Sequence, residues 1–123
     1  IEKIEKIEMN LSAFGVESDD FPSVDAVIDF IKDSSSCVKS FYNPEKKGSS
    51  YSLDKDEMQE ILNLLQISEV QKLKTEYKVS ISDQPNSTTI IYTNKTKYVI
   101  KDYGLCGEGP LRKLYGIVYR IIL

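Results

Sequence analysis

The chain contains no histidine and no tryptophan, and only two of its 123 residues are cysteines. The absence of histidine removes the usual general base near neutral pH and the commonest metal ligand. Ser-His and Cys-His nucleophile arrangements are therefore excluded within one chain. A zinc site would need both cysteines together with carboxylates, and no Cys-x-x-Cys spacing supports one. We therefore expect no histidine-dependent enzyme, no cofactor and no metal site.

Long apolar runs and clustered basic residues are also missing. No stretch of about 18 apolar residues occurs, so we expect no membrane span. The net charge is −3 and the densest basic groups are the pairs Lys46-Lys47 and Arg112-Lys113. Nucleic-acid binding needs clustered lysine and arginine, so no nucleic-acid partner is expected. The balance of 41% hydrophobic and 28% charged residues is typical of a globular protein, and the length fits one domain over residues 1–123.

Cys37 and Cys106 leave two readings open. In an exported protein they could form a disulfide, which would close a long loop and stabilise the fold by about 4 kcal/mol. In a cytosolic protein they would be two ordinary thiols.

The first half of the chain shows both hydrophobic periods. Ile7, Met9 and Leu11 alternate with polar residues, which predicts a strand over about 4–14. A helix through the first ten residues is the competing prediction, because isoleucines recur three apart there. Ser23 is then a suitable N-cap, and apolar residues follow at helical spacing, which predicts a helix over about 24–33.

In the middle of the chain, residues 37–42 and 49–53 read as strands separated by a loop that contains proline and glycine. Asp54 and Glu57 have the spacing of a capping box, so a helix is predicted over about 55–66. Residues 70–77 read as an irregular linker.

The last third predicts a β-hairpin followed by a helix. A β-prone piece near 79–81 precedes two strands, at 87–93 and 96–101. We expect the face of this hairpin that carries no lysine to be the core side, which comprises Thr89, Ile91, Tyr98 and Ile100. Pro110 suits the first turn of the closing helix.

These elements predict an α+β fold. Helices occur among the predicted antiparallel strands rather than in strict alternation with them. We expect a single antiparallel sheet of about five to six strands, with three helices packed largely on one face.

A set of landmarks in the last third carries a resemblance. They occur in a fixed order around the predicted hairpin: Leu73-Lys-Thr-Glu76-Tyr77, Ser82-Asp83-Gln84-Pro85, Asp102-Tyr103-Gly104 and Gly109-Pro110-Leu111. The chain thereby resembles an uncharacterised family of small bacterial domains, often found in exported proteins or lipoproteins, most clearly over residues 53–123. The resemblance implies an α+β domain at the periplasm or cell surface, with no established activity.

Three carboxylates lie within these landmarks, at Asp83, Asp102 and Glu108. They could form a polar pocket or a hard-cation site, because Ca²⁺ favours several oxygen ligands. They can equally serve the backbone, with Asp83 capping a turn, Asp102 fixing the loop after its strand and Glu108 near a helix N-terminus. We favour the structural interpretation.

Tyrosine is abundant, with eight residues, and could build a binding face, since its ring gives a large contact area at low entropy cost. The candidate partner-binding residues are Tyr77, Asp83, Tyr92, Asp102, Tyr103 and Glu108. The first hypothesis is an exported, non-catalytic domain that binds a protein or cell-envelope partner through its sheet and the 102–110 loop. The second is a histidine-free hydrolase or lyase that uses Asp83 and Asp102 as an acid–base pair, which requires their carboxyl groups to lie within about 5–10 Å of each other.

Overall fold

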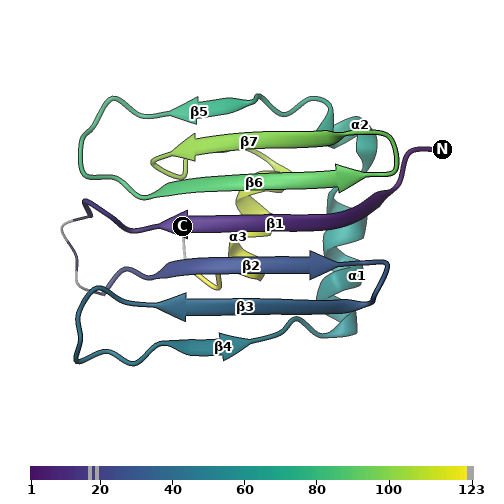
Figure 1. Cartoon of the computed structure of the whole chain (residues 1–123). Helices are drawn as coiled ribbons and strands as arrows, with labels where there is room; N and C mark the ends of the chain where they lie inside the picture. Colours follow the sequence, from purple (N-terminus) through teal and green to yellow (C-terminus); the bar gives the residue numbers. More distant parts are fainter. Residues whose placement is uncertain (17, 19, 122–123) are drawn as a thin grey trace.

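The computed structural model describes residues 1–16, 18 and 20–121. In this part of the chain seven strands form one mixed sheet in the order β4-β3-β2-β1-β6-β7-β5 (Figure 1). The strands are β1 Ile4–Ser12, β2 Ser23–Asp29, β3 Ser34–Ser40, β4 Ser49–Tyr51, β5 Glu76–Lys78, β6 Asn86–Thr93 and β7 Lys97–Tyr103. The first strand of the sequence is the middle strand of the sheet, where it pairs antiparallel with both β2 and β6.

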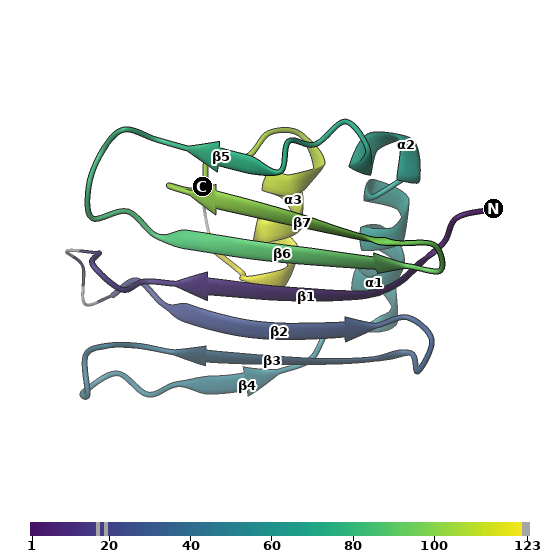
Figure 2. The ribbon, with the colours of Figure 1, turned by 45° about the horizontal axis from the view of Figure 1, so that its top comes forward.

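The helices are α1 Lys55–Leu64, α2 Ile67–Val70 and α3 Pro110–Val118. All three lie on the same side of the sheet (Figures 1 and 2). The opposite side of the sheet carries no helix in the described part of the chain, and we call it the open face. None of the helices described combines the length and the apolar character needed to cross a membrane.

The core lies between the sheet and the helices. Inward-facing residues of the central strands are almost fully buried, including Ile7, Leu11, Ile28 and Ile91. They meet the apolar faces of α1 and α3, which bury Met58, Ile61, Leu111, Leu114, Tyr115 and Val118. Burial of a large aliphatic side chain contributes roughly 1.5–3 kcal/mol, so this layer is the main source of stability.

The predicted helix at 24–33 is wrong, because residues 24–29 belong to β2 and residues 30–33 form the turn that follows it. Val24, Ala26 and Ile28 are buried and alternate with Asp25 and the partly exposed Val27. β-Branched residues and pairing on both sides, with β1 and β3, favour the extended chain over the helical spacing.

The sheet prediction needs two further corrections. It has seven strands in the described chain rather than five or six, and it is mixed, because β5 pairs parallel with β7. The predicted piece near 79–81 is displaced to 76–78, so that it overlaps the end of the linker expected over 70–77. The short helix α2 was not predicted and overlaps that linker only at Val70. The fold remains broadly α+β.

Several local predictions are confirmed. β1 runs over Ile4–Ser12, which excludes the alternative helix. Asp54 caps α1, accepting a hydrogen bond from the Glu57 N–H at 2.8 Å while Glu57 accepts from the Asp54 N–H at 3.0 Å. The β6–β7 hairpin has the expected core side, with Thr89, Ile91 and Ile100 buried.

Candidate functional site

The six predicted partner-binding residues do not form one surface. Tyr77 and Asp102 are buried on the helix side of the sheet. Tyr92 and Tyr103 lie on the open face, since they alternate with the buried residues of β6 and β7. They are at opposite ends of the hairpin, because Tyr92 pairs with Lys97 and Tyr103 with Asn86. The remaining two, Asp83 and Glu108, are exposed in loops.

Asp102 is fully buried, with 0% of its surface exposed, and its carboxylate organises the following loop. One oxygen accepts the Cys106 N–H at 2.9 Å and the Cys106 thiol at 3.4 Å. The other accepts the Gly107 N–H at 2.8 Å and the Tyr115 hydroxyl at 2.7 Å. The side chain therefore joins the end of β7, the loop and α3.

Two glycines of this loop, Gly104 and Gly107, allow close packing. Gly104 has φ +97°, which favours glycine, and a Cβ at Gly107 would lie 2.8 Å from the Asp102 carboxylate and 2.4 Å from Leu111. The loop thus has to approach the carboxylate closely to donate its N–H groups. This accounts for Gly104 and Gly107 through backbone conformation and close packing.

The acid–base hypothesis finds no support in this geometry. The Asp102 carboxylate is occupied by main-chain donors and a tyrosine, and it is not accessible to a substrate. Asp83 lies in a loop and lines a surface hollow together with Val16, Ser18 and Gln84. Among the described residues, no group of three or more cysteines and carboxylates is placed to hold a metal ion.

Both cysteines are free thiols in the structure. Burial raises the pKa of the Cys37 thiol. Burial and the hydrogen bond to Asp102 raise the pKa of the Cys106 thiol. A raised pKa keeps a thiol protonated near neutral pH and lowers its nucleophilicity, so neither cysteine has the features of an activated nucleophile.

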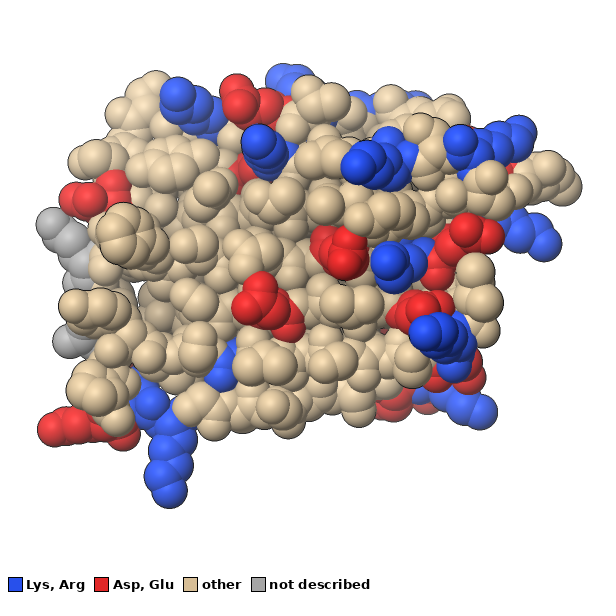
Figure 3. All heavy atoms as spheres, in the orientation of Figure 1, with Lys and Arg blue, Asp and Glu red and all other residues tan. Residues whose placement is uncertain are grey.

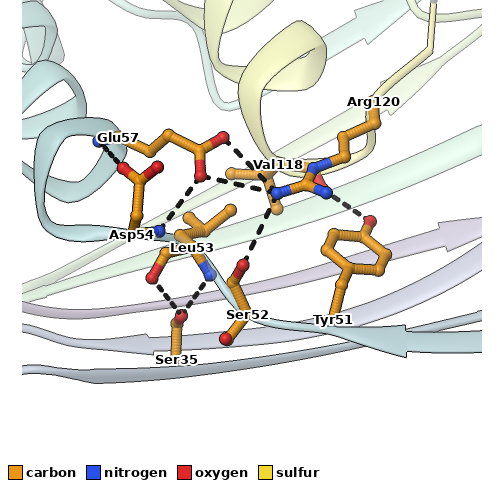
Figure 4. Close-up of polar contacts among 8 residues, drawn as sticks. All are labelled: Ser35, Tyr51, Ser52, Leu53, Asp54, Glu57, Val118 and Arg120. Atoms are coloured by element: carbon orange, nitrogen blue, oxygen red, sulfur yellow. Dashed lines mark hydrogen bonds and ion pairs between the residues drawn. The ribbon is translucent and has the colours of Figure 1, made fainter.

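Arg120 links three elements at the β4 edge (Figure 4). Its guanidinium lies 3.4 Å from the Glu57 carboxylate and 3.5 Å from the Ser52 carbonyl oxygen, and 4.5 Å from the centre of the Tyr51 ring. The Tyr51 hydroxyl donates to the Val118 carbonyl at 2.7 Å, and burial raises the pKa of Tyr51 to about 12. A partly exposed ion pair contributes little to folding stability. The main effect of these contacts is therefore to fix the end of α3 against α1 and β4.

The buried tyrosines predict a loss of stability at alkaline pH. Burial raises the pKa of Tyr115 and of Tyr119, whose rings stack 5.4 Å apart. In the unfolded chain both ionise near pH 10, whereas the folded state retains their protons. Their contribution is therefore complete below pH 10 and decreases above it, by up to about 1.4 kcal/mol per pH unit for each group.

Denaturant titrations between pH 8 and 11.5 check this expectation. The free energy of unfolding should decrease less steeply above pH 10 in the Tyr115→Phe variant, which has one buried tyrosine fewer to ionise on unfolding. Tyr42→Phe is the matched control, because Tyr42 is exposed and should leave the slope unchanged. A free energy of unfolding that stays constant from pH 9 to 11.5 would contradict it.

The open face departs from the polar surface expected of an exposed sheet side. Val27 and Val38 are 40% and 47% exposed, and Ile90 and Val99 are partly exposed on the other half of the sheet. We call these four residues the apolar patch. In register, Val27, Glu8, Ile90 and Val99 form one row across β2, β1, β6 and β7. Figure 3 shows mostly uncharged atoms over the middle of this face, interrupted by acidic side chains.

The charged and polar groups within the patch are already paired with one another. The Tyr92 hydroxyl donates to Glu8, and the Lys6 ammonium lies 4.6 Å from the centre of the Tyr92 ring. Asn10 donates to the Asp25 carboxylate at 2.6 Å. Pairing reduces the desolvation cost when such a surface is covered. A shallow hollow of about 370 Å³ lies among these residues.

The predicted hairpin places Ile90, Tyr92 and Val99 on the lysine-bearing side, away from the core, which is confirmed. The sequence did not reveal that they share this face with Val27 and Val38. The helix predicted over 24–33 would bury Val27. Val38 falls in the strand predicted over 37–42, and the residue pattern there does not indicate which side faces outward. The alternation Val24, Ala26, Ile28 was the signal available, since it places Val27 on the opposite side.

These features define an α+β domain whose helices cover one face of the sheet and leave the other open. The sequence profile of a family described as "Domain of unknown function (DUF6438)" matches residues 37–122, more than half of the chain. The chain belongs to this family. No curated protein and no solved structure matches this chain. Membership of a family without an assigned function is thus confirmed, whereas bacterial origin and export stay predictions.

Proposed function

We propose that the chain is an exported, non-catalytic domain that binds a protein of the cell envelope through the open face of its sheet. The observation that carries this proposal is the apolar patch, which interrupts the polar side of the sheet on four strands. Exposed apolar patches of this kind commonly mark contact surfaces. The hollow among the residues around the patch is shallow, and such a broad surface suits a protein better than a small molecule, which prefers a deep pocket.

The non-catalytic part of the proposal is supported by chemistry. Histidine is absent from the chain. Asp102, the most deeply placed acid, is held by hydrogen bonds to the loop and Tyr115. Tyr77 and Asp102 are buried and are not part of the proposed contact surface, whereas Tyr92 lies beside the patch.

The test is a double substitution, Val27→Asp with Val38→Asp. Both side chains are partly exposed, so the variant should fold, and charge on the patch should weaken partner binding at least tenfold. Envelope proteins retained by the immobilised wild-type domain are identified, purified and titrated against both proteins. Ile81→Asp is the matched control, because Ile81 is 65% exposed in the loop after β5 and should bind like wild type.

Two results would count against the proposal. Equal affinity of the purified partner for the wild type and the double variant would remove the patch as the contact surface. A partner found in the cytosolic fraction alone would contradict export.

A further inference from the structure

Four aromatic side chains gather at one end of the sheet. Phe14 and Phe21 come from the connection between β1 and β2, and Phe41 and Tyr42 follow β3. They line a cavity of about 460 Å³. Phe14 and Tyr42 are 92% and 88% exposed, so their rings contribute little to the core and are free to contact a ligand.

A row of hydroxyl groups forms the floor of this cavity. Ser12 ends β1, Ser23 begins β2 and Ser40 ends β3, and all three line the cavity. Ser23 and Ser40 are direct partners in the ladder, and Ser12 lies next to Leu11, which pairs with Val24. The three serines are thus side by side on adjacent strands, on the open face. Paired residues in an antiparallel ladder have Cα atoms about 4.5–5.5 Å apart, a spacing comparable with the width of one sugar ring.

The loop main chain orients two of these hydroxyls. The Ala13 N–H donates to the Ser23 hydroxyl at 3.1 Å, and the Phe14 N–H donates to the Ser12 hydroxyl at 3.3 Å. A hydroxyl that accepts one hydrogen bond still carries its own hydrogen and can donate it to a ligand oxygen. The floor therefore presents hydroxyl groups that can still donate to a ligand.

We propose that this cavity, which comprises Ser12, Phe14, Phe21, Ser23, Ser40 and Tyr42, is a saccharide-binding site. A saccharide has apolar C–H faces that pack on aromatic rings and hydroxyls that exchange hydrogen bonds with serine. An apolar peptide side chain would match the rings but would bury the serine hydroxyls without partners, which costs free energy. The site is beside the apolar patch and shares no residue with it, so it goes beyond the protein-binding function proposed above.

The experiment begins with the wild-type chain on an array of oligosaccharides built from glucose, galactose, mannose and N-acetylglucosamine. Proline-rich peptides on the same array represent the competing occupant. The best-bound oligosaccharide is then titrated by NMR. We expect shift changes at the serine row, and an affinity about tenfold lower in Phe14→Ala and in Tyr42→Ala, because each substitution removes one stacking surface.

Controls separate stacking from general damage. Tyr42→Phe keeps the ring and should bind within about twofold of wild type. Ile31→Ala changes an exposed side chain beyond the opposite end of β2 and should have no effect. Because Phe14 and Tyr42 are exposed, their alanine variants should keep the wild-type NMR spectrum outside the site. The proposal is overturned if no oligosaccharide binds, if binding survives both alanine substitutions, or if proline-rich peptides occupy the cavity instead.

Discussion

A chain that starts at residue 37, where the family match begins, should fail to fold. The missing residues include all of β1 and β2, which occupy the centre of the sheet between β3 and β6. Without them, β4-β3 and β6-β7-β5 have no common neighbour. Five large, almost fully buried side chains would be lost, namely Ile7, Met9, Leu11, Val24 and Ile28.

The magnitude makes the outcome clear. At roughly 1.5–3 kcal/mol for each buried side chain, the loss is about 8–15 kcal/mol, comparable with the whole stability of a typical domain. Circular dichroism and an NMR spectrum without shift dispersion would report the unfolded state. Adding a peptide of residues 1–36 should restore structure, because it supplies the central strands. A cooperative thermal transition in the isolated 37–123 chain would contradict this account.

Local signals were read correctly where they depend on neighbouring residues. The Asp54–Glu57 capping box needs only one helical turn, and the structure contains both of its hydrogen bonds. The core side of the β6–β7 hairpin followed from the positions of Lys97 and Lys101 on β7. Such features are visible in sequence because their partners are close along the chain.

Features that depend on distant partners were missed. Val24, Val27 and Ile28 satisfy a helical spacing as well as part of a strand alternation, and the choice is made by β1 and β3 on either side. β5 pairs parallel with β7 over three residues on each strand. The next strand in sequence, β6, lies on the other side of β7, so the connection from β5 to β6 passes β7. No local residue pattern specifies such a pairing.

The candidate sites show the same division. The role of Asp102 in fixing its loop was anticipated, because an acid at a strand end followed by glycines commonly accepts main-chain N–H groups. The aromatic cavity was not, since Phe14 and Phe41 are far apart in sequence and meet because β1, β2 and β3 are neighbours. Phenylalanines in predicted loops and strand ends were the available signal.

Substitutions of Asp102 and of Asp83 should differ sharply in their effect on stability. Replacing Asp102 with alanine leaves the Tyr115 hydroxyl and the N–H groups of Cys106 and Gly107 without their acceptor inside the protein. Unsatisfied buried donors cost about 1–3 kcal/mol each, with partial relaxation, so we expect a loss of about 3–5 kcal/mol. Asp83→Ala, in an exposed loop, should change stability by about 0.5 kcal/mol or less.

Urea denaturation of the variants measures this difference. Asp102→Asn keeps the shape of the side chain but turns its amide N–H₂ toward one of the two pairs of donors that the carboxylate accepts. We expect it to lower the free energy of unfolding by about 2 kcal/mol. This variant can still be measured if Asp102→Ala does not fold. In the background of Tyr115→Phe, the Asp102→Asn substitution should cost less, because one donor has already been removed, with a coupling of about 0.5–3 kcal/mol. Stability within about 1 kcal/mol of wild type for Asp102→Ala would show that the loop and α3 are held by the apolar core alone, and that the buried carboxylate is retained for another reason.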